Sequence, residues 1–535
     1  MRARDLTRFD GTTYDLLVVG GGIHGLASAY DAASRGLRVA LVEAGDFGSG
    51  ATFNHQKTAH GGLRSLASGH LGRARESIRE RRALARIAPW FLRPLPFLVG
   101  TYRSVLKNRL ALRAAFKADA WLGRRRNEGL EPELHLPTPR LVSKAATLRL
   151  FPGIRQDGLT GGAQWYDYQI IEADRLTMSF AAAADAAGAD IANYVEATQA
   201  VREGGRVMGM VVRDRLTDRS FEIKARVTLN ATGSRAGEVM RLLGVDRPFP
   251  VLKAMNLVTS RPARDMALAA PTRDGRMLTL VPWRGRALVG TSQSAATADP
   301  GNVAVTSAEI DAFIEDANFA FPALKLSAAD VTLVHRGIVP ATARNGKVDL
   351  KPSSEIIDHG NGAITVVGVK FTTARGVAER AVNVVARRLH QRLPPSRTAR
   401  TALPGAAIAD HEALAIETAR DLHRDVPLPL IRHLIALYAE GAAEIIRLVH
   451  QRPTLGEPLC AGSETIQAEV VYTIRREMAV RLSDIVIRRT TRGSAGEPPA
   501  ECVRAAAKIA QMELAWDDQR TAKEIADVAA FYAVG

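Results

Sequence analysis

The 535-residue chain has little cysteine, few aromatic residues and no long apolar run. Its two cysteines, Cys460 and Cys502, are too few for a disulfide framework and lack the spacing of metal ligands. This scarcity is typical of a reducing compartment. No segment approaches the roughly 20 consecutive apolar residues of a membrane span, and the first residues lack the apolar core of a signal peptide. We therefore expect a cytoplasmic protein without a bound metal.

Basic residues are in excess, because 72 lysines and arginines stand against 56 acidic residues, a formal net charge of +16. No nucleic-acid motif accompanies them, so we interpret them mainly as solvated helix faces and expect no nucleic-acid partner. One stretch, Trp90–Phe97, combines arginine with aromatic and apolar residues. Such a surface binds anionic headgroups without crossing the bilayer, which predicts peripheral contact with the inner face of the cell membrane. The alternative is a buried helical layer.

The N-terminal residues have the pattern of a βαβ unit. Tyr14–Val19 is continuously apolar, which predicts a parallel strand buried on both faces. A glycine turn follows, then a helix over 23–35 that Gly36 ends, and a second strand at Leu37–Val42. The chain is also too long for one ordinary domain. These features predict an α/β protein with a Rossmann-type domain and at least one further domain.

Later segments predict the remaining elements. Ala225–Gly233 and Ala363–Lys370 have the pattern of strands that end in glycine turns. Residues 70–130 have the pattern of basic helices broken by prolines, and residues 240–350 alternate as antiparallel strands do. From residue 405 onward the patterns are helical, which predicts a separate helical domain.

The turn after the first strand contains a G-x-G-x-x-G sequence formed by Gly20, Gly22 and Gly25. Because it follows a strand and opens a helix, its glycines allow a tight turn and close approach of the backbone to a pyrophosphate. Glu43, at the end of the second strand, is placed to accept hydrogen bonds from the adenosine ribose. An acidic residue at this position disfavours a 2′-phosphate, and therefore NADP.

Two distant segments favour FAD over NAD. A flavin lies along the protein and needs contacts from several parts of the chain. Asn230–Gly233 turns close to the dinucleotide after its strand, and Gly368–Thr373 precedes a helix. The positive N-terminus of that helix would face the flavin pyrimidine ring, where negative charge grows on reduction. With the glycine turn at Gly20–Gly25, these two segments make three in the order along the chain that an FAD site needs, which predicts that the cofactor is FAD.

Together these residues resemble the FAD-dependent glycerol-3-phosphate dehydrogenases, within the wider D-amino-acid-oxidase-like flavoproteins, over nearly the whole chain. Lys57–Arg64 is similar to the family segment K-x-x-H-G-G-L-R beside the flavin. Further similar segments follow in the family's order: Trp165–Asp167, Asn230–Gly233, Val281–Trp283, Gly290-Thr291, Lys370–Thr373, Glu469–Tyr472, Arg475, Glu477, Asp484 and Arg488–Thr490. The motifs and the resemblance imply these FAD-binding residues: Gly20, Gly22, Gly25, Glu43, Thr52, Lys57, His60, Gly61, Gly62, Gly233, Gly368, Lys370, Phe371 and Thr372.

The resemblance also implies the division of the chain into parts. We expect an FAD-dependent oxidoreductase domain over residues 1–400 and a C-terminal helical cap over 405–535. Within the first, the FAD-binding part takes about 12–70, 165–235 and 355–395, and an inserted antiparallel-sheet substrate part takes about 71–164 and 236–354.

Several positions of the expected pocket depart from the family pattern. Ser65 replaces a tyrosine, Asn256 a histidine and Val339 an arginine, and Gln293 stands where aspartate is usual. Valine offers no bidentate fork to a phosphate, and asparagine cannot act as a base at neutral pH. One lost hydrogen bond to a charged group is worth roughly 1.5–3 kcal/mol, enough to change the substrate preference.

Some cationic residues of the pocket remain. Arg64 and Lys370 match family positions, and Lys351 lies where a second phosphate-binding arginine is expected. His335 precedes Val339 by four residues, so both face one side of a strand. It could replace the missing base or cation, or only satisfy a local hydrogen bond. We expect catalysis to involve Arg64, Asn256, His335 and Lys370, and substrate binding to involve Arg64, Ser65, Val339 and Lys351.

The preferred hypothesis is an FAD-dependent dehydrogenase that oxidises a small, anionic polyol phosphate or related alcohol by hydride transfer to the flavin. A quinone or another acceptor would then take the electrons. A second hypothesis is an amine, amino-acid or hydroxy-acid oxidase of the same fold, because a neutral amine needs no alkoxide base. A third is a flavin-binding protein with decayed catalysis. The sequence leaves open a covalent flavin link at His55 and assembly as a homodimer.

Overall fold

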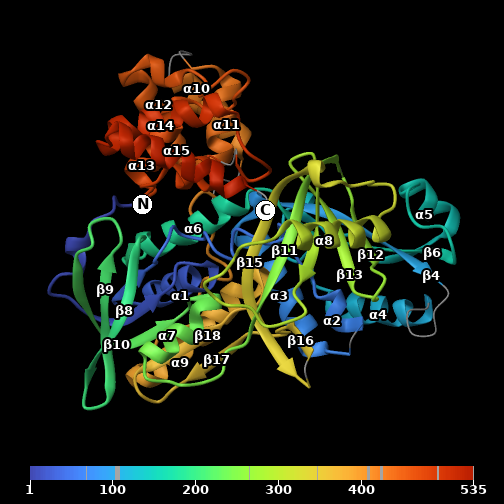
Figure 1. Ribbon diagram of the computed structural model, residues 1–535, viewed down its shortest axis with the longest axis horizontal. Coiled ribbons are helices and arrows are strands. Elements are labelled where there is room, and N and C mark those ends of the chain that lie inside the picture. The colour runs from blue at the N-terminus through green and yellow to red at the C-terminus, as the bar shows by residue number, and fades with distance from the viewer. Residues whose placement is uncertain are drawn as a thin grey trace.

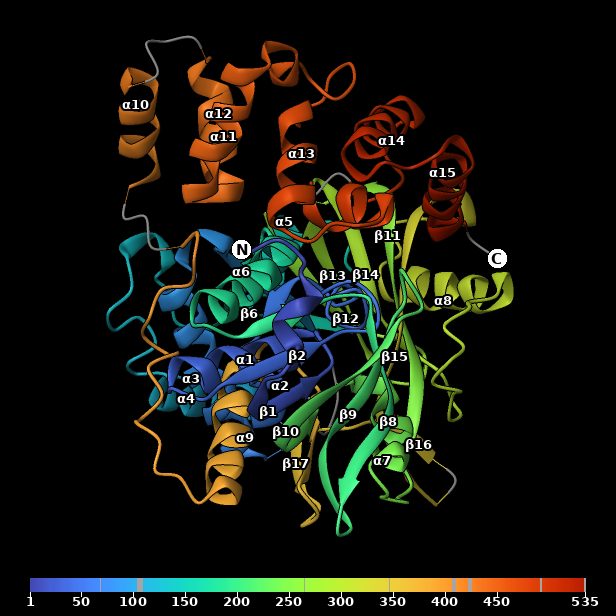
Figure 2. The ribbon, with the colours of Figure 1, turned by 90° about the vertical axis from the view of Figure 1, so that its left-hand side faces the viewer.

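The computed structural model describes residues 1–67, 69–102, 109–263, 265–345, 347–406, 410–421, 426–490 and 493–533. The chain forms two sheets with helices packed on them, and the helices of the last part of the chain stand together on one side of the sheets (Figures 1 and 2). The predicted α/β class with a C-terminal helical part is confirmed.

The first sheet has the order β17-β18-β10-β1-β2-β7, and the strands from β18 to β7 are parallel. The β17 strand is antiparallel, and the hairpin β8–β9 extends from β10. The bounds of these strands are β1 Thr13–Val19, β2 Val39–Val42, β7 Asp190–Ala192, β8 Val195–Glu203, β9 Arg206–Asp214, β10 Ser220–Asn230, β17 Glu355–Asp358 and β18 Ala363–Val367.

Both faces of the β1 strand are buried, as its continuous apolar run predicted. Leu16 and Val18 belong to the core under the helices, whereas Leu17 and Val19 belong to a second core on the opposite face, which the helix α7 (Ala236–Leu242) borders. A strand that is buried on both faces has apolar residues at successive positions, whereas a strand with one solvated face alternates apolar and polar residues.

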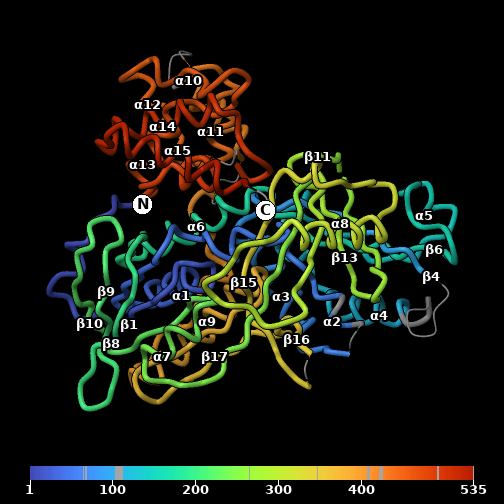
Figure 3. The backbone as a smooth tube through the Cα atoms, viewed as in Figure 1, coloured from blue at the N-terminus to red at the C-terminus, as the bar shows by residue number. Residues whose placement is uncertain are grey.

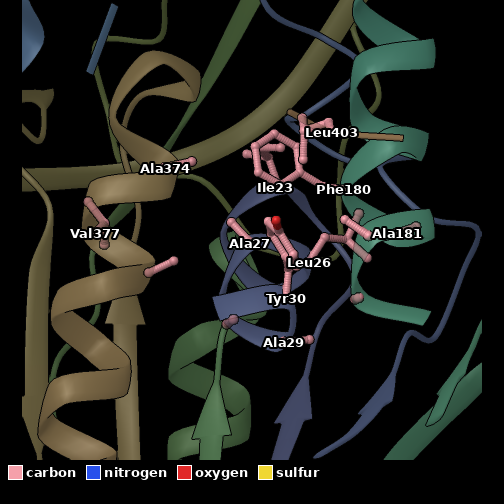
Figure 4. Close-up of a cluster of buried hydrophobic side chains, with 14 of the residues drawn as sticks. Ile23, Leu26, Ala27, Ala29, Tyr30, Phe180, Ala181, Ala374, Val377 and Leu403 are labelled. Atoms are coloured by element: carbon pink, nitrogen blue, oxygen red, sulfur yellow. The ribbon is translucent and has the colours of Figure 1, made fainter. Parts of the chain in front are cut away.

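The helices α1 (Ile23–Ser34), α6 (Ala173–Ala186) and α9 (Ala374–Leu389) pack together on one face of this sheet. Their contact is apolar and includes Leu26, Phe180 and Val377, with Leu403 closing one end (Figure 4). Segments at the two ends of the oxidoreductase sequence therefore lie side by side, which the backbone path of α1 and α9 makes visible (Figure 3).

The second sheet has the order β16-β15-β11-β14-β13-β12-β4-β6-β3, with β5 paired to β6. All of its strand pairs are antiparallel except β12 with β4. The helix α8 (Ser307–Ala320) covers one face through Ile310 and Phe313. The bounds are β3 Thr58–Ala59, β4 Leu92–Tyr102, β5 Arg140–Ser143, β6 Leu159–Ile170, β11 Val251–Pro262, β12 Ala267–Pro271, β13 Met277–Trp283, β14 Arg286–Gln293, β15 Val331–Arg344 and β16 Lys347–Leu350. Residues 165–170, which the sequence analysis placed in the FAD part, lie in this sheet.

The prediction that residues 70–130 are helical is wrong for 92–102, which form the β4 strand. Helices flank it: α2 Leu63–Ala67, α3 Leu71–Ile87, α4 Arg109–Leu122 and α5 Lys144–Leu150. The strand pairs with β6 along its length but with β12 only from Phe97 onward. Pro94 and Pro96 therefore lie where one edge of β4 is unpaired, and there a residue without an N–H is tolerated.

This correction also concerns the stretch proposed to touch a membrane. Phe97 is 2% exposed and stacks on Trp165. The Trp90 ring lies flat on His411 of the C-terminal part, with 3.6 Å between ring centroids, and its Nε1 donates to Ala436 O. The aromatic residues of this stretch thus contact other parts of the protein.

The C-terminal part contains α10 His411–Asp421, α11 Leu428–Tyr438, α12 Ala442–Gln451, α13 Gln467–Arg476, a π-helix at Asp484–Arg489, α14 Ala500–Leu514 and α15 Asp518–Tyr532. Its core is continuous with one face of the second sheet through Val258, Trp283 and Leu333. Among the described residues, no helix is both long enough and apolar enough to cross a membrane.

The two cysteines are joined in this C-terminal part. Cys460 and Cys502 form a disulfide with 5.0 Å between their Cα atoms, across a sequence separation of 42. The expectation of a reducing compartment, drawn from the scarcity of cysteine, has no support from this pair.

His433 of α11 makes the stability of the C-terminal part depend on pH. Its Nε2 lies 3.1 Å from Oε1 of the buried Glu469. Burial lowers the pKa of His433, but the hydrogen bond and charge of Glu469 outweigh it and raise the pKa above 6.5. The stabilisation is fully present below pH 6.5 and is lost as the pH rises through the folded-state pKa. We expect a lower melting temperature at pH about 8.5 than at about 6, and a smaller difference in His433→Gln. Equal pH slopes for the two proteins would contradict this assignment.

Candidate active site

The G-x-G-x-x-G turn leaves no room for side chains. Gly20 has a φ of +109°, and a Cβ there would lie 2.7 Å from Ala231 O at the end of β10. A Cβ on Gly25 would collide with Gly20 O, and one on Gly22 would lie 3.3 Å from Thr52 Oγ1. The ends of β1 and β10 thus meet at this turn, and a glycine turn of this kind before a helix allows close approach of its backbone to a phosphate.

Glu43 and Thr52 hold the turn in place. Glu43 Oε2 accepts from Gly21 N at 2.6 Å, and Oε1 accepts from Gly45 N at 2.8 Å. Thr52 Oγ1 accepts from Ile23 N, the first residue of α1, at 3.0 Å. Burial raises the pKa of Glu43, and the two backbone donors oppose that rise. The carboxylate therefore lies directly beside the dinucleotide turn.

The segment Lys57–Arg64 lies against the turn before α9. His60 N donates to Thr372 Oγ1 at 3.0 Å, and the preceding His55 ring stacks on Phe371 with 4.7 Å between centroids. Gly61 N donates to Asp167 Oδ1 at 2.5 Å. Three segments that the sequence analysis selected separately are thus brought together.

Lys57 itself has an internal role in the structure. Its side chain is fully buried, and Nζ donates to Phe53 O at 2.6 Å and lies 3.9 Å from Asp174 Oδ1. The ammonium also lies over the rings of Phe53 and Trp283, at 4.5 and 5.4 Å. Burial lowers the pKa of Lys57. Its ammonium thus fastens the flanking segment to the second sheet.

The remaining predicted turn residues line the same edge of the first sheet. Gly233 follows β10 with a φ of +61°, and Gly62 has a φ of +82°. A Cβ on Gly368 would collide with the ring of His24. Lys370 is half-buried and directly precedes the 3₁₀ turn Phe371–Thr373.

His24 is a residue that the sequence analysis missed, although it lies inside the G-x-G-x-x-G turn. Burial lowers the pKa of His24 to about 4, so its ring is neutral at pH 7. Among the described residues, His24 Nε2, His55 Nε2 and Gln56 Nε2 are buried without a hydrogen-bond partner. Each such group costs about 1–3 kcal/mol unless a ligand pairs with it. The contact of the His24 ring with Gly368, which joins the glycine turn to the segment before α9, is visible only in the structure.

Asn256 and His335 lie opposite each other on β11 and β15. Asn256 is 3% exposed, and its amide is occupied, because Nδ2 donates to Asn54 O at 3.0 Å and Oδ1 accepts from Thr291 Oγ1 at 2.8 Å. His335 is fully buried, faces the Phe53 ring at 5.2 Å and lies near the backbone of His55 and Ser494. Burial and then Lys57 hold the pKa of His335 well below 6.5.

The other predicted pocket residues lie in different elements: Val339 in β15, Lys351 directly after β16, and Arg64 and Ser65 in α2. Val339 of β15 is half-buried and pairs with Leu252. Lys351 is bound by Glu355, with 3.0 Å between Nζ and Oε2. Ser65 is half-buried in α2, and the side chain of Arg64 in the same helix lies outside the described residues.

Comparison with known families agrees with this geometry. Residues 15–383 match the family model of the FAD dependent oxidoreductases, which is more than half of the chain. The chain is an FAD-dependent oxidoreductase. Residues 396–521 match a second model, the C-terminal domain of alpha-glycerophosphate oxidase, and cover the C-terminal helices from α10 to α14 and the start of α15.

Curated relatives of this oxidoreductase are similar over nearly its whole length. A glycerol-3-phosphate dehydrogenase of Synechocystis is 32% identical and covers 91% of this chain and 90% of its own. Glycerol-3-phosphate dehydrogenase 2 of Mycobacterium tuberculosis is 30% identical and covers 98% and 89%. The chain thus belongs to the family of these dehydrogenases. The crystal structure of a glycerol-3-phosphate dehydrogenase from Bacillus halodurans, complexed with FAD, has the same fold, with a TM-score of 0.77, 24% identity and coverage of 98% and 96%.

FAD is the cofactor of this oxidoreductase, and the described residues fit it. The turn is closely packed and takes only glycine at Gly20 and Gly25, and Glu43 lies beside it. The buried nitrogens His24 Nε2 and His55 Nε2, which have no hydrogen-bond partner, border the segments expected at the flavin. When bound, FAD supplies the acceptor for a hydride.

Proposed function

We propose that this enzyme oxidises an alcohol carbon of a small anionic substrate, a polyol phosphate or hydroxy acid other than glycerol 3-phosphate. The names of the curated relatives support the class of reaction, since they are glycerol-3-phosphate dehydrogenases. The occupied amide of Asn256 supports the altered substrate. Its carbonyl oxygen accepts from Thr291 and its NH2 group donates to Asn54, and an amide held in this way cannot take a proton from the substrate hydroxyl as a histidine can.

The cations expected in the pocket support an anionic substrate, and the missing arginine at Val339 supports one that carries less negative charge than glycerol 3-phosphate. Lys370 lies beside the turn before α9, and Arg64 lies in the α2 helix that follows the Lys57–Gly62 segment. Lys351 would bind substrate only after leaving Glu355, and Val339 adds apolar surface where the family has an arginine. A longer or less charged tail than that of glycerol 3-phosphate fits these residues.

His335 is proposed as the proton acceptor in place of the missing family histidine. It faces Asn256 across the β11–β15 pair, and burial together with Lys57 keeps its ring neutral at pH 7. A neutral imidazole is able to take a proton as hydride leaves the substrate carbon.

The test is anaerobic mixing of the purified yellow enzyme with polyol phosphates, hydroxy acids and amines while the flavin absorbance is recorded. We expect one anionic alcohol to bleach the flavin within seconds. Bleaching by amines alone would instead assign an amine or amino-acid oxidase, which the neutral Asn256 also permits. No bleaching by any reductant except dithionite would favour a flavin-binding protein with decayed catalysis.

Peripheral membrane contact and transfer of electrons to a quinone belong to the same proposal. Its support is the net charge of +16, since the aromatic residues of Trp90–Phe97 contact other parts of the protein. We expect sedimentation with anionic vesicles at low salt and release by about 0.5 M salt, which screens charge interactions. Equal sedimentation with neutral vesicles would refute an electrostatic attachment. Gel filtration would show whether the enzyme is a homodimer.

A further inference from the structure

The junction between the first sheet and the C-terminal helices contains a buried carboxylate with four donors. Asp46 is 2% exposed and lies in the loop after β2. Its Oδ1 accepts from Arg489 Nη2 at 2.7 Å and from Asn193 Nδ2 at 3.1 Å. Its Oδ2 accepts from Arg488 Nε at 2.7 Å and Arg489 Nη1 at 2.9 Å. Three of the four hydrogen bonds therefore come from the C-terminal part.

The loop that contains Asp46 also contains Glu43. The Glu43 carboxylate accepts from Gly21 N and Gly45 N, and Gly48 N donates to Gly21 O at 3.0 Å. A Cβ on Gly21 would lie 2.7 Å from the buried Phe47 ring, so the loop packs directly on the dinucleotide turn. Any shift of Asp46 would move the carboxylate beside that turn.

The charges at this junction are well matched. Burial raises the pKa of Asp46, but Arg489 and then Arg488 outweigh it and lower the pKa to about 2. Asp46 is thus ionised at any working pH. Arg488 also donates to Asp484 Oδ1 at 2.7 Å, and Arg489 donates to Glu477 O at 3.1 Å. Both arginines are less than 10% exposed, so neither can exchange its partners for water without the junction opening.

We propose that Arg488 and Arg489 are positioning residues for FAD. They hold Asp46, and through it the Glu43 loop, in the conformation that receives the adenosine ribose. The C-terminal part then belongs to the cofactor site although it follows the whole FAD-binding domain in the sequence. The proposal rests on the assignment of Glu43 to the ribose and is independent of the substrate.

A second ion pair at the same junction provides a matched control. Arg175 of α6 binds Glu477 through both ends of its guanidinium, at 2.8 and 2.7 Å, and also donates to Leu437 O. It joins the same two parts and is also buried, 7% exposed against 0% for Arg489, but it has no contact with the Glu43 loop in the described hydrogen bonds. Weakening it tests whether docking of the C-terminal part alone affects FAD.

The experiment measures the Kd of FAD for the apoprotein by quenching of flavin fluorescence. Arg489→Lys removes the fork to Asp46 and Arg175→Lys removes the fork to Glu477. We expect Arg489→Lys to raise the Kd about tenfold or more, and Arg175→Lys to raise it less than about threefold. Equal effects of the two variants would overturn the proposal, because they would show only that docking matters.

A double-mutant cycle separates positioning from a merely structural effect. In a Glu43→Ala background, Arg489→Lys is expected to raise the Kd less than about threefold, since the group that it positions is gone. Full additivity would overturn the proposal. If Glu43→Ala alone leaves the Kd unchanged, the assignment of Glu43 to the ribose fails, and with it this inference, whereas the substrate proposal stands. If Arg489→Lys does not fold, Asp46→Asn, which keeps the shape of the side chain, takes its place with the same expected values.

Discussion

Glycerol 3-phosphate at millimolar concentration is expected to reduce the flavin of this enzyme about 10²–10⁴-fold more slowly than its preferred substrate does. The physical reason is that Asn256 stands where the family has its histidine and cannot take the alcohol proton, so the proton must pass to His335 on the neighbouring strand, which is not the family's position for the base. The half-buried Val339 removes a charged fork for the phosphate as well. Stopped-flow absorbance of the flavin under anaerobic conditions measures the rate.

Reversal of the two departures provides the control for this prediction. Asn256→His together with Val339→Arg is expected to speed reduction by glycerol 3-phosphate by at least about tenfold. Gln293→Glu, at the half-buried end of β14, supplies neither an imidazole nor a cation for the phosphate and is expected to leave it slow. Fast reduction of the unaltered enzyme by glycerol 3-phosphate would refute the prediction. In that case His335, which faces Asn256, serves as the base for glycerol 3-phosphate as well, and His335→Ala should abolish this activity.

Gly25→Ala is expected to yield a protein that is purified nearly colourless. The added Cβ would collide with Gly20 O, so the dinucleotide turn must open before α1 can form beside it. Overpacking of this kind costs about 1–3 kcal/mol, which raises the Kd of FAD roughly 10–100-fold. The flavin-to-protein absorbance ratio and a fluorescence titration with FAD measure the effect.

Gly50→Ala is the matched control for that substitution. A Cβ on Gly50 would meet nothing within 4 Å, although the residue lies in the same part of the chain, between Glu43 and Thr52. We expect it to retain FAD and the thermal stability of the unaltered protein. Equal flavin content in Gly25→Ala and Gly50→Ala would show that the glycine turn does not determine cofactor binding.

Local features of this protein could be predicted from the sequence because short-range geometry determines them. A continuous apolar run followed by spaced glycines indicates a buried strand and a tight turn wherever it occurs, and β1, the turn at Gly20–Gly25 and α1 have that form. The turns at Gly233 and Gly368 were likewise visible as strand ends. Since these ends meet at one edge of a parallel sheet, the sequence was sufficient to predict FAD.

The tertiary structure decided which partner each polar or aromatic group has. Pro94 and Pro96 look like helix breakers in the sequence, but they lie on an unpaired edge of β4 because β12 begins to pair only at Phe97. Lys57 lies in a flavin-associated motif, yet its ammonium is held by Phe53 O, since the second sheet surrounds it.

Tertiary structure also decided the residue pairs on which the proposals for this site rest. Asn256 faces His335 through the register of two strands, which no local pattern specifies. Asp46 binds Arg489 across 443 positions of the chain, because the C-terminal helices dock on the loop after β2. The sequence by itself thus determined the fold class, the family and the cofactor, whereas the packing of distant segments determined which groups are free to bind and which are already occupied.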